Sequence, residues 1–395
     1  MKLESWVYPW DMASAGVDAM LSEMRDLGLQ GLRIASNYHP IGTLSPRSKN
    51  RRILYTELGG VFFPVRPERY GRIRPQCWHE AEVLNVWPQV AERVDRYGMS
   101  MSAWTIGMFQ PWITHQVPDT ARVTPSGDAI PSMACPANPD VRAFFTCLCA
   151  DLAGQYPIEG IHLEGISFHH YNYGWVRPRI LIDLAPWTNF LMSLCFCQAC
   201  RSKADRHGVD VEGLRTRILR ELDHCFEAPG DTDRAPPMEQ RYHEWLQTDG
   251  DFAKFVSLRE DAVVQLIQEI SDAVHAIRPG CRIGVWSPIE VDGSAGVNLE
   301  RVMRVVGSVL VWEPSKRLDA ARRIRAATLA SGRDVHLSHF QACGWPHGAD
   351  SPEVRHELET AYSLPVDSVV FYNYGLVRQG QMRRMIEIAR SLERT

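Results

Sequence analysis

Residues 160–170 of the chain read GIHLEGISFHH. Ile161 and Leu163 belong to an apolar run typical of a buried strand, and this run stops at Glu164. Because side chains alternate along a strand, His162 and Glu164 share one face while Ile161 and Leu163 share the other. An acid placed there either ends the strand or stands at the mouth of a barrel of parallel strands. The rest of the sequence decides between these two interpretations.

A unit of a short β-branched or aromatic run, a loop and an amphipathic helix recurs along the chain. Eight runs are predicted strands: Trp6–Tyr8, Leu32–Ser36, Ser100–Ile106, Ile161–Glu164, Ile283–Trp286, Val309–Glu313, Val335–His339 and Val369–Asn373. Apolar residues at three- and four-residue spacing predict helices over Val17–Leu27, Val90–Tyr97, Val141–Leu152, Phe252–Ile277, Leu318–Leu329 and Met382–Leu392. Strands that alternate with helices pair in parallel, so eight such units predict a closed (β/α)₈ TIM barrel of the α/β class. An open doubly wound sheet is the alternative, but no GxGxxG fingerprint follows a predicted strand.

Loop lengths place the extra residues on one face of this barrel. The turns from helix to strand are short, whereas the connections that leave strands at 37–78, 107–138 and 165–250 are long. In a barrel these long strand-to-helix loops all lie on the C-terminal face, where active sites form. No Ser/Gly-rich linker divides the chain, so we predict one barrel domain over residues 1–395, with an insertion at about 165–250 after the fourth strand.

Bulk composition narrows the class of protein. The 395 residues are 45% hydrophobic and 23% charged, as in ordinary globular domains, and the formal net charge of -4 gives no basic surface for nucleic acid or an anionic membrane. The N-terminus lacks the apolar core of a signal peptide, and no window has the apolar length of a transmembrane helix. Ten cysteines without a secretion signal indicate reduced thiols. We therefore expect a cytoplasmic protein without nucleic-acid or membrane partners, and a homo-oligomer is compatible with the sequence.

Polar and aromatic residues gather at the predicted strand ends. Glu164 ends the fourth strand and Glu313 the sixth, which provides the pair of carboxylates that glycosidic bond cleavage uses. Further side chains there can stack on a sugar ring or bind its hydroxyls: Trp10, Asp11, Asn37, Tyr38, His39, Trp104, His162, Trp286, His339, Gln341, Asn373 and Tyr374. By strand alternation, Arg33, Ala35 and Asn37 are predicted to face the barrel interior on the second strand. Val335, Leu337 and His339 are predicted to do so on the seventh.

Structural roles are open for some of these residues. Glu164 could pair with Arg33 or His162 inside the barrel, and Asp11 could cap the first helix. Glu290, beyond the fifth strand, competes with Glu313 for the role of second acid.

A cysteine motif follows the fourth strand. Residues 195–200 read CFCQAC, so Cys195, Cys197 and Cys200 could hold a structural zinc if a fourth ligand comes from elsewhere. The candidates for that ligand are Cys147, Cys149, His207 and Cys225. The alternative is that these cysteines are buried thiols at the start of a helix, since no second CxxC motif completes the set.

Three passages carry a resemblance to a known group of proteins. They are ACPANPDVRAFF at 134–145, GIHLEGISF at 160–168 and CFCQACRSKADRHGVD at 195–210. Together they resemble bacterial proteins classed as hypothetical glycoside hydrolases with TIM-barrel catalytic domains, and the cysteine spacing is similar to that of zinc-binding β-galactosidases. The resemblance implies a catalytic acid at Glu164. Many such hydrolases carry the second catalytic carboxylate on the seventh strand. Here that strand reads DVHLSHFQACGW and has no acid beyond its first residue, so the role of second carboxylate is assigned to Glu313.

The sequence therefore predicts a glycoside hydrolase that acts on a small glycoside or oligosaccharide and requires no cofactor, and it leaves a structural zinc open. Glu164 would serve as nucleophile or general base and Glu313 as general acid. One alternative is a metal-dependent sugar isomerase, epimerase or lyase with an ion held between His39, Glu164, Glu313 and His339. Another is a barrel that binds carbohydrate without turning it over.

Overall fold

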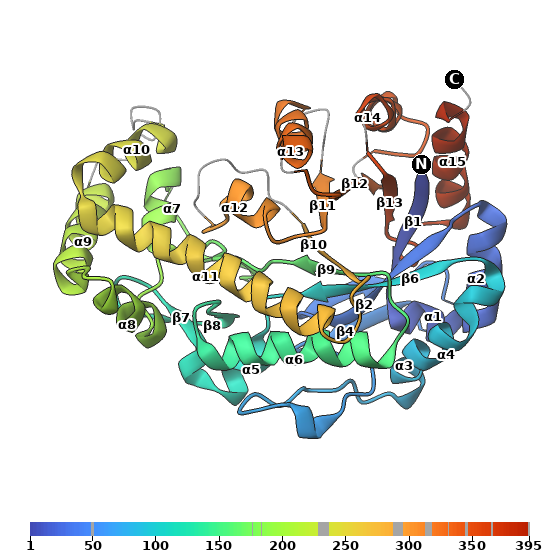
Figure 1. The fold of residues 1–395 in the computed structure, drawn as a ribbon, viewed down its shortest axis with the longest axis horizontal. Helices are drawn as coiled ribbons and strands as arrows, with labels where there is room; N and C mark the ends of the chain where they lie inside the picture. Colours follow the sequence, from blue (N-terminus) through green and yellow to red (C-terminus); the bar gives the residue numbers. More distant parts are fainter. Residues whose placement is uncertain are drawn as a thin grey trace.

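The structure is a computed structural model in which residues 1–48, 51–175, 177–182, 184–227, 237–286, 295–312, 318–330, 332–343, 347–364 and 366–393 are described (Figure 1). Glu313 and Glu290 lie outside these residues.

Eight parallel strands form the closed ring at the centre of the molecule. They are β1 (Lys2–Val7), β2 (Gly31–Tyr38), β6 (Ser100–Ile106), β9 (Gly160–Glu164), β10 (Arg282–Trp286), β11 (Ser308–Trp312), β12 (His336–Ala342) and β13 (Ser368–Tyr372). The first strand closes the ring, because β1 pairs with β13 on one side (Lys2 opposite Ser368) and with β2 on the other (Glu4 opposite Gly31). Each of the eight predicted runs overlaps one of these strands, and the predicted TIM barrel is confirmed.

Helices cover the outside of this ring. Those packed around the barrel are α1 (Pro9–Ala15), α2 (Val17–Leu27), α3 (Ala81–Leu84), α4 (Val86–Arg93), α5 (Pro111–Gln116), α6 (Pro139–Gln155), α11 (Gly250–His275), α12 (Leu299–Met303), α13 (Leu318–Ala330), α14 (Pro352–Ser363) and α15 (Gln379–Leu392). Side-chain caps start several of them: the oxygen of Asn138 accepts from the first turn of α6, and Asp249 does the same for α11. Their apolar faces pack on outward strand residues such as Ile161 and Leu163. No helix in the described ranges combines the length and the apolar character needed to span a membrane.

Two of the long connections contain small sheets that the sequence did not predict. In the first, β3 (Ile41–Leu44) and β4 (Ile53–Thr56) form an antiparallel hairpin, and β5 (Gly60–Val61) pairs with the end of β2. In the second, β7 (Ala121–Val123) pairs with β8 (Ala129–Ala134). These strands are too short to show a clear two-residue period.

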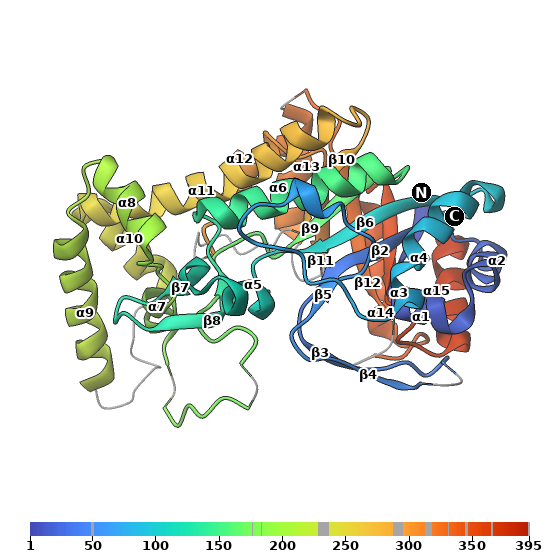
Figure 2. The same ribbon diagram turned by 90° about the horizontal axis from the view of Figure 1, so that it is seen from below.

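Four helices follow β9 and form a lobe at one end of the molecule. These are α7 (Pro186–Met192), α8 (Gln198–Arg206), α9 (Val211–Glu227) and α10 (Met238–Thr248), and Figures 1 and 2 show them far from α15. The lobe has its own apolar core, which includes Phe190 and Leu214. Helix α11 joins this core to the barrel, because Phe252 packs in the lobe whereas Ile267 packs against the strands.

Paired polar groups fill the lower interior of the barrel, near the N-terminal ends of the strands. The guanidinium of Arg33 donates to Glu4 Oε2 at 2.6 Å and to Ser338 Oγ at 2.8 Å, and it lies 3.3 Å from His162 Nδ1. Burial alone would raise the pKa of Glu4, but the charges of Arg33 and Lys2 lower it well below its usual range. Glu4 is therefore an ionised structural acid.

Candidate active site

Glu164 is the last residue of β9, and its side chain lies in the upper interior of the barrel. Its neighbour in the ring is β6, where Ile106 stands opposite Glu164 and Trp104 opposite His162. The indole Nε1 of Trp104 donates a hydrogen bond to Glu164 Oε2 at 2.7 Å. Gly165 follows with a φ of 72°, which lets the chain turn away from the strand at once. The carboxyl group therefore stands where the barrel opens towards its long loops.

The surroundings of Glu164 hold a proton on it at neutral pH. Burial raises the pKa of Glu164 to about 8, against the smaller opposing effect of the hydrogen bond from Trp104. Within the described chain, no Arg, Lys or His forms an ion pair with Glu164, and Arg33 is engaged by Glu4 instead. The interpretation of Glu164 as a buried ion-pair partner of Arg33 or His162 is therefore wrong.

Aromatic rings form the walls around this carboxyl group. Trp6 of β1 stacks on Trp104 with ring centroids 4.7 Å apart, and Trp286 of β10 lies 5.1 Å from Trp6. Phe340 of β12 lies 5.3 Å from Trp286 and 5.4 Å from Tyr372 of β13. Such rings combine apolar faces with polar edges, which suits stacking on the C–H faces of a sugar.

Three phenols near Glu164 are joined through their hydroxyls. Tyr8 lies at the centre, 3.0 Å from the hydroxyl of Tyr38 and 3.1 Å from that of Tyr372. Burial raises the pKa of all three, and the proximity of Glu164 contributes to each increase. These phenols stay protonated and offer neutral hydrogen-bonding groups beside the acid.

This geometry occurs in a fold shared with known enzymes, although no protein-family model and no curated protein sequence matches the chain. The catalytic domain of β-amylase from Paenibacillus polymyxa is similar with a TM-score of 0.56 and 11% identity, over 96% of this chain and 94% of that one. The glycoside hydrolase domain of PgaB (BpsB) from Bordetella bronchiseptica gives 0.55 and 12%, over 98% and 99% of the two chains. A β-galactosidase from Marinomonas ef1 gives 0.57 and 13% over 100% of this chain, which spans 60% of that chain.

The chain has the fold of glycoside hydrolase TIM-barrel domains. At these identities the likeness concerns the fold, and the chemistry has to be argued from the side chains.

The structure gathers part of the predicted site around Glu164. Tyr38, Trp104 and Trp286 belong to the aromatic wall, and Trp10 stacks on Tyr8 at 4.2 Å as the next ring outward. His39 lies 4.3 Å from the ring of Tyr38, and burial lowers its pKa.

Other predicted residues lie away from this carboxyl group. Asn37 is fully buried and bonds both backbone groups of Ile106, because a bulge between Ala35 and Asn37 turns Tyr38 inward in its place. The predicted inward orientation of Asn37 is therefore wrong. His162 lies one layer below Glu164, beside Arg33.

Three more predicted residues have local structural contacts. Asp11 accepts from Ser45 at 2.6 Å and lines a separate cavity of about 530 Å³ beside the β3–β4 hairpin. Asn373 is buried and accepts from the backbone of Gly375, and the ring of Tyr374 lies under the guanidinium of Arg47.

The prediction for the seventh strand is wrong in its orientation. Ser338 and Phe340 face the barrel interior, so Leu337, His339 and Gln341 face outward. His339 lies between β12 and the helix layer, and its Nε2 is 3.1 Å from Gln341 Oε1. A metal ion shared by His39, Glu164 and His339 is thereby excluded.

Sequence reasoning missed several residues of the aromatic wall, namely Tyr8, Phe340, Tyr372 and Tyr173. Tyr173 lies in the loop after β9 and stacks on His169 at 4.4 Å. Tyr8 could have been found from strand alternation, since it directly follows β1 and continues the face that carries Glu4 and Trp6. The predicted inward face was assumed to be polar, and this assumption hid an aromatic layer.

A second cluster of reactive side chains lies between the barrel and the lobe. Cys135, Cys195, Cys197 and Cys200 are buried, and their sulfur atoms all lie within 4.8 Å of one another. Within the described part of the chain, this is the one group of His, Cys, Asp and Glu that could hold a metal ion. The fourth member is Cys135, which follows β8. The fourth-ligand candidates from the sequence, Cys147, Cys149, His207 and Cys225, are not part of it.

Proposed function

We propose that the protein is a glycoside hydrolase in which Glu164 is the general acid. The observation that carries the proposal is the unpaired carboxyl group at the C-terminal rim of the barrel, whose pKa is raised to about 8. A carboxyl group that keeps its proton at neutral pH can protonate the leaving oxygen of a glycosidic bond. The aromatic walls support a carbohydrate ligand, since they offer faces for stacking and few fixed charges.

The hydrogen bond from Trp104 would orient the acid. The indole N–H donates to Glu164 Oε2, so that oxygen acts as the acceptor and the proton is left on Oε1. Oε1 would then face the substrate. This assignment makes Glu164 the general acid, a role that was predicted for Glu313.

The second carboxylate remains a prediction. Glu313 directly follows Trp312, the last residue of β11, and Glu290 is the competing candidate. In the proposal, Glu313 acts as nucleophile or as the base that activates water, depending on its separation from Glu164. The substrate class proposed is a small glycoside or oligosaccharide.

The test compares Glu164→Gln on leaving groups of different acidity. With alkyl glycosides, loss of the acid should lower kcat/KM by about 10³-fold, because general acid catalysis contributes about 10²–10⁴-fold. With 2,4-dinitrophenyl glycosides, whose leaving group needs no proton, the bond-cleaving step should change by less than about tenfold. Glu159→Gln, at the residue that precedes β9, is the matched control and should keep the wild-type kcat/KM on both substrates.

Each other outcome counts against the assignment. An equal loss on both leaving groups would make Glu164 the nucleophile or base, and unchanged turnover would exclude it from catalysis. A wild-type protein that binds saccharides but cleaves none of a panel of glycosides would be a carbohydrate-binding barrel instead.

We also propose that the four cysteines hold a structural zinc ion. Four thiolates at about 2.3 Å from zinc, placed tetrahedrally, lie about 3.8 Å from one another. The Cys135 sulfur lies 3.5 Å from that of Cys200 and 3.8 Å from that of Cys195, which fits such a site. The buried guanidinium of Arg259, which interacts electrostatically with Cys195 and Cys200, would offset the net negative charge. The ion would fix the loop after β8 to the start of α8.

Metal analysis of the purified protein tests this site. We expect one zinc per chain in wild type and in Cys147→Ser, and loss of the zinc with a lower Tm in Cys197→Ser. Equal zinc content in the two variants would contradict the site.

A further inference from the structure

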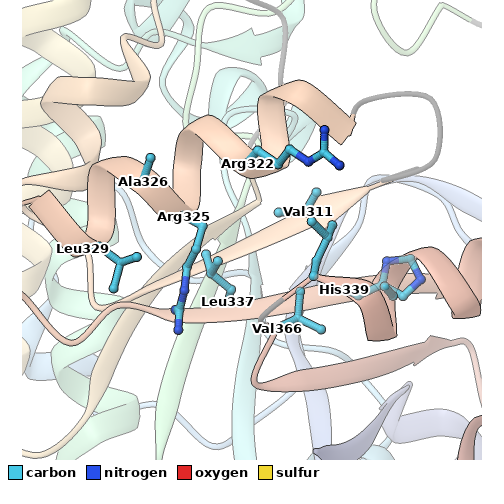
Figure 3. Close-up of a pocket in the computed structure, with 10 residues that line it drawn as sticks. Val311, Arg322, Arg325, Ala326, Leu329, Leu337, His339 and Val366 are labelled. Atoms are coloured by element: carbon cyan, nitrogen blue, oxygen red, sulfur yellow. The ribbon is translucent and has the colours of Figure 1, made fainter. Parts of the chain in front are cut away.

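Two arginine side chains outside the candidate active site differ in what they hold. Arg325 extends from α13 towards β12 along a mostly aliphatic cavity of about 290 Å³ (Figure 3), and its Nε–H has no acceptor among the described residues. Arg122 of β7 is 1% exposed, and both of its terminal nitrogens donate to main-chain carbonyl groups. Arg122 therefore fixes main-chain segments, a role that no described contact gives to Arg325.

The two carbonyl groups held by Arg122 belong to different parts of the molecule. Its Nη1 donates to the oxygen of His169, in the segment 165–175 that follows β9, and its Nη2 donates to the oxygen of Ser193, directly after α7 of the lobe. The Oγ of Ser193 in turn accepts from the backbone N–H of Tyr171 at 3.0 Å. Hydrogen bonds from a charged donor are stronger than neutral ones. The segment is therefore joined to the lobe at two neighbouring points.

The same segment forms one wall of the space around Glu164. The ring of His169 stacks on Tyr173 at 4.4 Å, and Tyr173 lies 5.4 Å from the ring of Phe109. A Cβ atom added to Gly174 would lie 2.3 Å from the ring of Phe109, so the segment packs closely there. The pKa of Tyr173 is raised by burial and then by the charge of Glu164, which shows that the phenol lies near the acid. The position of this segment therefore decides how well the carboxyl group is shielded from water.

The surroundings of Arg122 fix the direction of its guanidinium. The ring of Phe168, in the same segment, lies 5.7 Å from the guanidinium of Arg122 and 4.8 Å from that of Arg259, which is within the range of cation–π contacts. Arg122 also interacts electrostatically with Cys195 of the cysteine cluster. The guanidinium is thus placed between the cysteine cluster and the wall of the candidate active site.

We propose that Arg122 is a positioning residue of the candidate active site: by holding the carbonyl groups of His169 and Ser193, it keeps segment 165–175 at the barrel mouth, where its rings cover Glu164. The proposal rests on the proposed role of Glu164 as general acid. Without this hold, water reaches the carboxyl group, and the pKa of Glu164 falls from about 8 towards its ordinary value of 4.5.

Hydrogen exchange followed by mass spectrometry measures the hold on the segment without any substrate. In Arg122→Met, which keeps an unbranched apolar stem but loses both donors, the backbone amides of segment 165–175 should exchange at least about tenfold faster than in wild type. Ser193→Ala removes the acceptor of the Tyr171 N–H without exposing a buried charge, and it should speed up the same exchange about fivefold. Arg215→Met is the matched control, because Arg215 donates to a carbonyl group in the β7–β8 turn and its described bonds do not involve the segment.

The pH dependence of stability and of activity measures what the hold does to Glu164. In wild type, the free energy of unfolding should fall up to about pH 8, because the folded protein keeps the proton of Glu164. In Arg122→Met this fall should end at least about one pH unit lower, and the alkaline limb of the kcat/KM profile should move to lower pH by the same amount. Loss of the positive charge alone would raise the pKa of an acid, so the downward shift is specific to the loss of shielding. The phenols nearest to the carboxyl group have raised pKa values and do not titrate in this range: Tyr8, Tyr38, Tyr173 and Tyr372.

Each outcome decides the role of Arg122. Faster exchange with unchanged pH profiles would make Arg122 a purely structural residue and overturn the proposal, as would equal effects of Arg122→Met and Arg215→Met. If Arg122→Met does not fold, Ser193→Ala carries both measurements, and wild-type exchange in that variant overturns the proposal. If wild type cleaves no glycoside, the proposed function fails, but exchange and unfolding still show whether Arg122 keeps Glu164 covered.

Discussion

Glu4 and Glu164 both project into the interior of the same barrel, but only Glu4 has a cationic partner. Arg33 holds Glu4 ionised, whereas Glu164 accepts a single hydrogen bond from a neutral indole and keeps its proton to about pH 8. Burial is common to both acids, so it does not decide their protonation. The presence or absence of a paired charge separates a structural carboxylate from a candidate catalytic acid.

Trp6 separates these two environments. It follows Glu4 on the inward face of β1 and is 1% exposed, with Trp104 stacked on it and Trp286 beside it. These indoles form an apolar layer between the ion pair below and the barrel mouth above. Arg33 pairs with Glu4 below this layer, so no ion pair stabilises the ionised form of Glu164 above it.

Removing the two acids should have opposite consequences for stability. Glu4→Gln leaves Arg33 buried without its counter-charge and should lower the free energy of unfolding by about 3–5 kcal/mol. Glu164→Gln removes a carboxyl group that the folded protein has to keep protonated at pH 7, so this variant should raise the free energy of unfolding by up to about 3 kcal/mol. Urea unfolding followed by circular dichroism at pH 7 measures both. The double variant Glu4→Gln/Arg33→Met should recover part of the loss, and similar effects of the two single variants would contradict the contrast.

The pH dependence of stability should also have opposite signs for the two acids. Glu164 has a folded pKa of about 8 above its ordinary 4.5, so the folded protein binds a proton that the unfolded chain releases. The contribution of Glu164 to the free energy of unfolding is complete below pH 4.5 and is lost as the pH rises towards 8. The loss is at most about 1.4 kcal/mol per pH unit. Because the pKa of Glu4 is lowered, the stabilisation that ionised Glu4 contributes is present above pH 4.5 and is lost as the pH falls below that value.

Two variants separate these contributions in unfolding experiments across pH. In Glu164→Gln, the free energy of unfolding should no longer fall between pH 5 and 8, but it should still fall in acid. In Glu4→Gln, the fall in acid should be lost and the fall between pH 5 and 8 should remain. An unchanged slope in Glu164→Gln would show that the carboxyl group titrates normally in the folded protein.

The bond from Trp104 to Glu164 should set the alkaline limit of activity. Trp104→Phe removes the N–H that lowers the pKa of Glu164, so the alkaline limb of the kcat/KM profile should move up by about one pH unit and the maximum should fall about tenfold. Trp6→Phe replaces the indole that stacks on Trp104 but leaves the hydrogen bond to Glu164 in place, so this variant should keep the wild-type pH profile. Identical profiles for the two variants would reduce Trp104 to a packing residue.

The smallest effect is expected at the joined phenols. Tyr8→Phe leaves the hydroxyls of Tyr38 and Tyr372 without their shared partner and should cost about 1 kcal/mol of unfolding free energy. Tyr38→Phe removes only one of these contacts and should cost less. Urea unfolding of the two variants, side by side, checks this order.

The fold could be predicted from the sequence because helices and strands leave local periodic signals. Val17–Leu27 coincides with α2 and Ser100–Ile106 with β6. The inward faces were harder to predict, since a bulge in β2 shifts the alternation by one residue at Asn37. On β12, Leu337 and His339 share one face. The apolar Leu337 indicates that this face packs against helices, whereas the polar His339 indicates that it points into the barrel, so the pattern did not decide the orientation.

Long-range contacts account for the remaining errors. The CFCQAC motif marked three members of the cysteine cluster, but Cys135 lies 60 residues before Cys195, with no local signal that joins them. The sequence placed Arg33 inside the barrel, but it did not show that the partner of Arg33 is Glu4 on the neighbouring strand. Spacing along a chain does not report which side chains meet across a barrel.

The closure of the ring by β1 has a consequence for protein synthesis. β1 is translated before the other strands of the ring, yet one of its two neighbours, β13, contains Ser368, the partner of Lys2. At about 5–20 residues per second the wait between them is roughly 20–70 s. During that interval one flank of β1 exposes unpaired backbone groups. The ring can therefore close only after β13 has been translated.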